Sequence, residues 1–298
     1  MAAEGAAVVD VAQRPRELQD PLNFYFYHPL AARVARALLP GRISPNAVSV
    51  TGAGTFVASV LFYLYWPGVV GLALGLTLML LWHVLDGADG DLARLRGTAS
   101  LTGELIDGVC DYFGYTFMYF AFAFRLDDTL GGWAWALAWS AGGSHILQTN
   151  HAETQRRLYA WRVYGKSWIR QAAESGDAVF GRKSWFSRWF GFWGQGYVWL
   201  SNLMSPSANP LDEALAAATP EEAARIRGLI RDRSRASLAM EMMLGANPKT
   251  LIIAASIALG GPYYYFVAVL TVLNLILIVS IIHHKRVERQ LIATLGAR

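Results

Sequence analysis

The stretch HVLDGADGDLARLRGTASLTGELIDGVCD, residues 83–111, decides how the rest of the chain is organised. One apolar run ends where it begins, and a second apolar run follows its end. Asp86 and Asp89 are three residues apart, and Asp107 and Asp111 are four residues apart. In a helix, each of these spacings places both side chains on one face. The stretch therefore predicts two facing carboxylate pairs where two membrane helices meet.

Carboxylates at the edge of a bilayer need a compensating positive charge. Arg94 and Arg96 are the basic residues that lie nearby in the sequence. Oxygen ligands suit hard divalent cations such as Mg²⁺, Mn²⁺ or Ca²⁺ better than they suit Zn²⁺. We therefore expect one or two divalent cations between the two helices.

The same residues resemble the signature of the CDP-alcohol phosphotransferase family, D-x2-D-G-x2-A-R, then eight residues, then G-x3-D-x3-D. Every fixed position is present, as Asp86, Asp89, Gly90, Ala93, Arg94, Gly103, Asp107 and Asp111. A shorter family element, Pro-Asn-x-aliphatic-Thr/Ser, is similar to residues 45–49, PNAVS.

This resemblance implies a transferase that moves a substituted phosphate group from a CDP-alcohol to an acceptor hydroxyl and releases CMP. It implies two ions of Mg²⁺ or Mn²⁺ held by Asp86, Asp89 and Asp107, with Asp111 accepting the proton of the acceptor and also touching a metal. The nucleotide contacts that it implies are Asn46, Ser49, Gly90, Ala93, Arg94 and Gly103.

Two donor classes fit the resemblance. CDP-diacylglycerol, used with a small polar acceptor alcohol in phospholipid biosynthesis, ranks first. The alternative is a polar donor of the CDP-choline, CDP-ethanolamine or CDP-inositol type that transfers to a lipid or to a second alcohol. A different class of protein, a membrane cation transporter, could also place aspartates at a helix junction, but it does not require the glycine, alanine and arginine framework of the signature.

Composition predicts an integral membrane protein. Of the 298 residues, 54% are hydrophobic and 16% are charged, and the mean hydropathy is +0.29, which is high for a soluble protein. The net charge is +4, but the basic residues cluster beside apolar runs. Anionic lipid headgroups are therefore the expected partners rather than nucleic acid. The single cysteine, Cys110, excludes an internal disulfide.

Hydropathy predicts an all-α protein with six transmembrane helices, at about 45–66, 68–85, 102–124, from 133 onward, 247–260 and 262–282. Ser44 is expected to cap the first of them, with Pro45 in its first turn. Residues 41–298 would form the transferase membrane domain, with a cytoplasmic or interfacial insertion at about 156–240 that contains a capped helix starting at Thr219.

The segments before this domain differ in character. Residues 1–20 are expected to be a disordered cytoplasmic tail, and residues 21–40 to form an amphipathic helix at the membrane interface. The alternative for 21–40 is a helix that packs against a partner helix.

The fourth predicted span has a polar face. Its members recur at helical spacing: Ser144, Gln148, His151 and Gln155. They would either bind the acceptor or form hydrogen bonds between helices, and the sequence favours neither.

Basic residues lie at the start of span one, between spans two and three, and after spans four and six. This distribution predicts that both termini and the aspartates face the cytoplasm. The expected location is a bacterial inner membrane. A homodimer is compatible with this arrangement.

Overall fold

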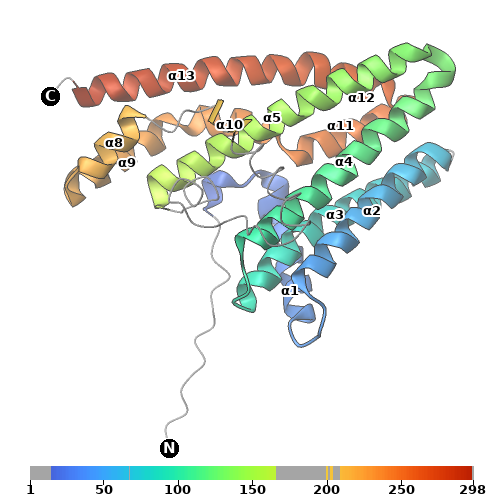
Figure 1. Cartoon of the computed structure of the whole chain (residues 1–298), viewed down its shortest axis with the longest axis horizontal. Helices are drawn as coiled ribbons and strands as arrows, with labels where there is room; N and C mark the ends of the chain where they lie inside the picture. The colour runs from blue at the N-terminus through green and yellow to red at the C-terminus, as the bar shows by residue number, and fades with distance from the viewer. Residues whose placement is uncertain (1–14, 67, 166–198, 201, 204–208, 297–298) are drawn as a thin grey trace, which may run out of the picture. The chain divides into compact units, whose positions relative to one another are not determined.

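The computed structural model describes residues 15–66, 68–165, 199–200, 202–203 and 209–296. Across these residues the fold is all-helical, as the sequence predicts, and contains no strand. The chain divides into two compact units, residues 1–115 and 116–298, and the division falls inside one helix, α4 (Figure 1).

The first unit is built from short N-terminal turns and helices, of which the helix at residues 68–95 contacts the two helices that precede it. Its elements are η1 (Arg16–Leu18), the π-helical turn η2 (Asn23–Tyr27), α1 (His28–Leu38), α2 (Pro45–Tyr65), α3 (Gly68–Leu95) and the first half of α4 (Leu101–Leu130).

The second unit contains the rest of α4 and the C-terminal helices. These are α5 (Gly132–Tyr164), α8 (Pro210–Ala217), α9 (Pro220–Arg233), α10 (Arg235–Leu244), α11 (Ala246–Ala258), α12 (Tyr263–Ala268), the π-helical turn η3 (Val269–Leu273) and α13 (Asn274–Gly296). The last three follow one another directly, so residues 263–295 form one long apolar helix.

Two predicted helix starts are confirmed. The Ser44 hydroxyl accepts a hydrogen bond from the backbone N–H of Ala47 at 3.2 Å, and Pro45 occupies the first turn of α2. At the start of α9, Thr219 and Glu222 form a reciprocal capping box.

The second predicted span was expected to end near Leu85, and as the end of the helix this was wrong. Helix α3 continues to Leu95, so Asp86 and Asp89 lie within it. It ends where Gly97 adopts a positive φ of 64° and Thr98 donates to the carbonyl of Ala93, a common helix terminator. The last turns of α3 contain glycines, which have weak helix propensity, but packing against α1 and α2 stabilises these turns.

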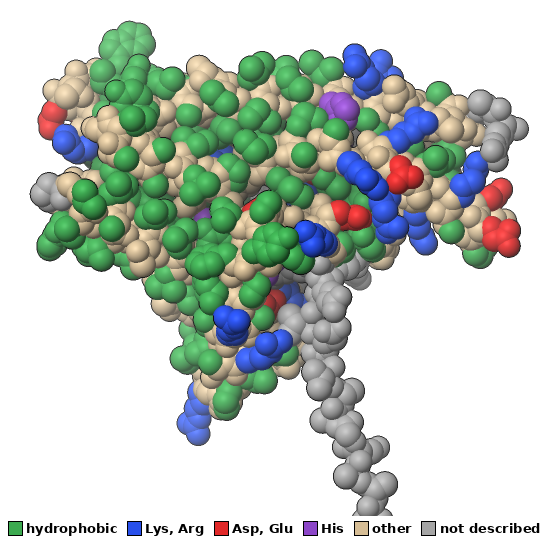
Figure 2. Space-filling model, turned by 180° about the vertical axis from the view of Figure 1, so that it is seen from behind, with side chains coloured by type: hydrophobic (Ala, Val, Ile, Leu, Met, Phe, Trp, Pro, Cys, Tyr) green, Lys and Arg blue, Asp and Glu red, His purple; other side chains and the backbone are tan. Residues whose placement is uncertain are grey.

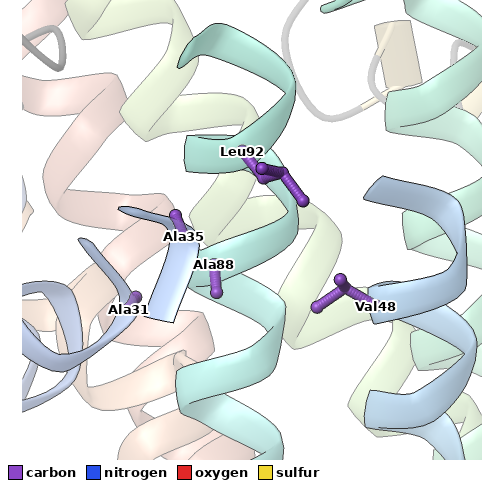
Figure 3. Packing of buried hydrophobic residues seen from close by; sticks show 5 residues of the cluster. All are labelled: Ala31, Ala35, Val48, Ala88 and Leu92. Atoms are coloured by element: carbon purple, nitrogen blue, oxygen red, sulfur yellow. The ribbon is translucent and has the colours of Figure 1, made fainter. Parts of the chain in front are cut away.

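That packing is a cluster of small and aliphatic side chains from three helices, shown in Figure 3. Its members are Ala31, Ala35, Val48, Ala88 and Leu92. A Cβ atom added to Gly87 would lie 2.9 Å from the Cβ of Ala31, so α1 and α3 are in very close contact at that level. The helix expected within residues 21–40 therefore packs against a partner helix, while its position at a membrane interface stays a prediction.

The predicted tail and insertion are described only in part. Residues 1–14 of the tail lie outside the described residues, whereas the Arg16 guanidinium lies over the Phe24 ring at 4.4 Å. In the insertion, residues 166–198, 201 and 204–208 are not described. Its described helix α8 is anchored by Arg162 of α5, which forms an ion pair with Asp212 at 2.7 Å and contacts Glu288 of α13.

Among the described residues, three helical stretches are long and apolar enough to cross a membrane, Pro45–Tyr65, Gly68–Leu95 and Tyr263–Leu295. The other predicted spans correspond to α4 and α5, which carry polar side chains, and to α11, whose 13 residues fall short of the roughly 20 that a bilayer requires. Figure 2 shows hydrophobic side chains over much of the visible surface. Along η3 and α13 the exposed hydrophobic residues include Val272, Leu275, Ile278, Val279 and Ile282. Exposed apolar surface of this extent is typical of lipid contact.

Arg96 fastens the loop between α1 and α2. Its guanidinium donates to the carbonyls of Leu38 at 2.9 Å, Gly41 at 2.8 Å and Ile43 at 2.6 Å. These carbonyls lie at or beyond the end of α1, where the helix no longer supplies N–H donors; the Leu38 carbonyl also accepts from the Gly41 N–H at 3.0 Å.

We expect Arg96→Ala to destabilise the first unit by about 2 kcal/mol, because several charge-assisted hydrogen bonds are lost together. Thermal unfolding of purified protein in detergent measures the change. Arg42→Ala is the matched control, since Arg42 is exposed in the same loop. Equal melting temperatures for the two variants would contradict the role assigned to Arg96.

Candidate active site

The signature residues lie in the first unit, where parts of three helices meet. Helix α3 carries Asp86, Asp89 and Arg94, and the first three turns of α4 carry Asp107 and Asp111. The first turns of α2 carry Asn46 and Ser49. At the start of helix α4, the Ser100 hydroxyl accepts a hydrogen bond from the Gly103 N–H at 3.1 Å. This N-cap fixes the first residue of the helix and therefore the turns on which Asp107 and Asp111 lie.

The carboxylates of the two helices come together. Asp89 is only 4% exposed, and its carboxyl group lies within hydrogen-bonding distance of that of Asp107. Asp86, Asp89 and Asp111 are all close enough to act electrostatically on Asp107. The four aspartates of the signature therefore form one electrostatic group.

This donor set suits a hard divalent cation by its chemistry. Two carboxyl groups in contact repel each other unless a proton or a cation lies between them, and carboxylate oxygens are preferred ligands of Mg²⁺ and Mn²⁺. Among the described residues, however, no three His, Cys, Asp or Glu side chains are arranged closely enough to hold a metal ion. The structure thus supplies ligands of the right kind without defining an ion position.

Each helix's carboxylates receive a hydrogen bond from a neutral side chain. The Ser49 hydroxyl donates to Oδ2 of Asp89 and also lies 3.3 Å from the carbonyl of Pro45. On the other helix, Nε1 of Trp82 donates to Oδ1 of Asp111 at 3.2 Å. Ser49 thus contacts a signature carboxylate, and its contact with a nucleotide stays a prediction.

Arg94 forms an ion pair with Asp91, one turn earlier on α3. Asp91 is 3% exposed and was not singled out from the sequence, because it occupies a variable position of the signature. The signal that could have revealed it is an acidic residue three positions before an arginine on a helix. A Cβ atom on Gly90 would lie 3.3 Å from Nη1 of Arg94, so the missing side chain gives the guanidinium room.

Asn46 and Gly103 bring the starts of α2 and α4 together. A Cβ atom on Gly103 would lie 4.0 Å from Oδ1 of Asn46 and 3.4 Å from Oγ of Ser100. Ala93 is half-buried on α3. Two helix N-termini at one place favour a negatively charged ligand, since their backbone N–H groups carry partial positive charge.

The polar face of α5 lies in the second unit and makes hydrogen bonds between helices. Ser144 accepts from Asn274 at 3.0 Å, Gln148 donates to Oδ1 of Asn274 at 2.8 Å, and His151 pairs with Ser280 at 3.0 Å. Gln148 and His151 are buried, while Gln155 is half-buried. The second of the two sequence interpretations is thus observed for three of these residues, and binding of the acceptor stays a prediction.

Comparison with known proteins identifies a family that part of the chain resembles. Residues 42–163 match the family model of CDP-alcohol phosphatidyltransferase, and the matched segment contains every aspartate of the signature. No curated protein matches the chain significantly. The family consists of transferases of substituted phosphate groups. The matched segment covers less than half of the chain and contains the four aspartates gathered between α3 and α4, so this part of the chain is similar to the CDP-alcohol phosphatidyltransferase family.

Proposed function

We propose that the protein transfers a substituted phosphate group from CDP-diacylglycerol to the hydroxyl of a small polar alcohol in phospholipid biosynthesis. The observation that supports this most directly is the contact between Asp89 and Asp107, which unites the carboxylates of α3 and α4 within the segment that matches the family. The lipid donor is supported by the exposed apolar surface of the helices, along which acyl chains could lie.

Asp86, Asp89, Asp107 and Asp111 would hold two ions of Mg²⁺ or Mn²⁺. Bound there, the ions would neutralise charge on the pyrophosphate and on the departing CMP. Their ligands come from two helices, so the packing that keeps α3 beside α4 also sets the spacing of the ligands.

In this reaction Asp111 accepts the proton of the acceptor hydroxyl. The hydroxyl oxygen forms a bond to the phosphorus that carries the donor's alcohol, the pyrophosphate P–O bond breaks, and CMP leaves with the bridging oxygen. The indole N–H of Trp82 can only donate a hydrogen bond, so Oδ1 of Asp111 is the acceptor in this contact.

The nucleotide would bind where α2, α3 and α4 begin or end, against Asn46, Ser49, Gly90, Ala93, Arg94 and Gly103. The two helix N-termini near Asn46 and Gly103 support this placement, because they favour phosphate. The acceptor would bind the polar face formed by Ser144, Gln148, His151 and Gln155. In the membrane, α4, α5 and α11 would complete six spans, with the aspartates on the cytoplasmic side of a bacterial inner membrane.

Asp111→Asn should lower the rate of CMP release by about 10²-fold or more, because an amide cannot accept the proton of the acceptor. CDP should still bind, which equilibrium binding to labelled CDP would show. Asp127→Asn is the matched control, because Asp127 is exposed near the other end of the same helix. Unchanged CMP release by Asp111→Asn would exclude Asp111 as the base, while loss of release with CDP binding retained would support the transferase over the transporter.

Removal of divalent cations with a chelator should abolish CMP release, and Mg²⁺ or Mn²⁺ should restore it. The assay would offer CDP-diacylglycerol and polar CDP-alcohols separately, each with pooled acceptors, and mass spectrometry would identify the new product. Release from the lipid donor alone supports our ranking, and release from a polar donor alone replaces it with the second donor class. Absence of CMP release from every donor would contradict the proposal that the protein is a CDP-alcohol transferase.

Ser49→Ala should weaken the apparent affinity for Mg²⁺ or Mn²⁺ by about tenfold, because residues that orient ligands affect metal affinity on this scale. If Ser49 instead contacts the nucleotide, the affinity for CDP will fall and that for the metal will not. Thr51→Ala is the control, since the Thr51 hydroxyl is exposed and bonds the carbonyl of Ala47 in the same helix.

A further inference from the structure

Trp82 is the tryptophan of α3 whose side chain reaches the carboxylate group. Its indole is 3% exposed, and Nε1 donates to Oδ1 of Asp111 at 3.2 Å across to α4. Trp82 lies four residues before Asp86, so it occupies the same face of α3, one turn away. The residue is not part of the family signature, and the sequence pattern did not identify it.

The indole has little freedom to turn, because rings surround it. Phe56 of α2 meets it edge-on at 4.7 Å between ring centroids, and Tyr115 of α4 meets it at 5.7 Å. The neighbouring His83 ring lies at 4.3 Å. Edge-to-face contacts of this kind are favourable and fix ring orientation.

The N-terminal segment supports the same cluster. Tyr27 of η2 is almost completely buried, and its ring lies 4.7 Å from that of His83. Aromatic rings from η2, α2, α3 and α4 therefore hold one N–H group in place. Tyr115 follows Asp111 by four residues, so carboxyl group and ring also share a face of α4.

A fixed donor has a definite chemical consequence for Asp111. The carboxyl group of an aspartate rotates about its Cβ–Cγ bond, and a hydrogen bond to Oδ1 restricts that rotation. Proton transfer requires the accepting oxygen to lie within hydrogen-bonding reach of the acceptor hydroxyl, so a restricted carboxyl group reacts more often from a productive geometry.

We propose that Trp82 is a positioning residue for the transfer reaction: its indole N–H orients the Asp111 carboxyl group that receives the proton of the acceptor. This inference rests on the proposed function, in which Asp111 is the base. Trp82 itself needs no contact with either substrate. Its contribution should therefore appear in kcat and leave substrate binding unchanged.

Trp82→Phe keeps an aromatic ring and removes the N–H. We expect kcat for CMP release to fall about tenfold, the scale of one hydrogen bond to a charged group. The KM of the donor should stay within about twofold. Trp135→Phe is the matched control, because it makes the same change at a tryptophan packed against Phe120 and Phe124 in the second unit.

Trp82→His separates positioning from packing. The histidine ring restores an N–H donor but fills the apolar site less well than phenylalanine. We expect thermal stability to decrease in the order Trp, Phe, His, and kcat to decrease in the order Trp, His, Phe. If kcat follows the order of stability instead, Trp82 is a packing residue and the inference is wrong.

The outcomes distinguish this inference from the function on which it depends. An active wild type, an inactive Asp111→Asn and a fully active Trp82→Phe would overturn the positioning role alone. Full CMP release by Asp111→Asn would overturn the proposed base, and the positioning role with it. A raised donor KM with unchanged kcat in Trp82→Phe would place the indole in substrate binding and would also contradict the inference.

Discussion

The contact between Asp89 and Asp107 is the constraint around which the first unit is arranged. Two carboxyl groups on neighbouring helices repel each other when both are ionised, and partial burial strengthens that repulsion. The helices must therefore be held together by other contacts, and a cation or a proton must offset the charge. The ring contacts that Phe56 and Trp82 make with Tyr115 of α4 contribute to the first requirement. Packing of Ala31 and Ala35 against the last turns of α3 supports the other side of that helix.

Local chemistry in the sequence was sufficient to place two helix starts and to place the motif on its helices. Ser44 and Thr219 cap α2 and α9 because a hydroxyl at the N-cap bonds backbone N–H groups of the first turn, a relation that involves neighbouring residues only. The extension of α3 to Leu95 could not be predicted in this way. This extension depends on the packing of Ala88 and Leu92 against α1 and α2, which are distant in sequence.

The same limit explains which site residues the sequence revealed. The signature gives the aspartates, because their spacing repeats at helical periodicity. It does not reveal the contacts of Trp82 or Arg96, because their partners are distant in sequence. Asp111 lies 29 residues from Trp82, and Leu38 lies 58 residues from Arg96. Asp91 was missed although its spacing from Arg94 is a local signal, because Asp91 occupies a variable position of the signature. On α5, spacing correctly gathered Ser144, Gln148 and His151 on one face, but only the structure shows Asn274 and Ser280 as their partners.

The two helices of the site also differ in what holds their carboxylates. On α3, Asp89 takes its hydrogen bond from Ser49, a small hydroxyl that can also rotate toward the Pro45 carbonyl. On α4, Asp111 takes its hydrogen bond from an indole that can only donate and that rings on several sides hold still. A ligand to a mobile ion benefits from a partner that can adjust, whereas a base benefits from one that cannot. The role of base proposed for Asp111, in addition to ion binding, is therefore consistent with the more rigid partner that it has.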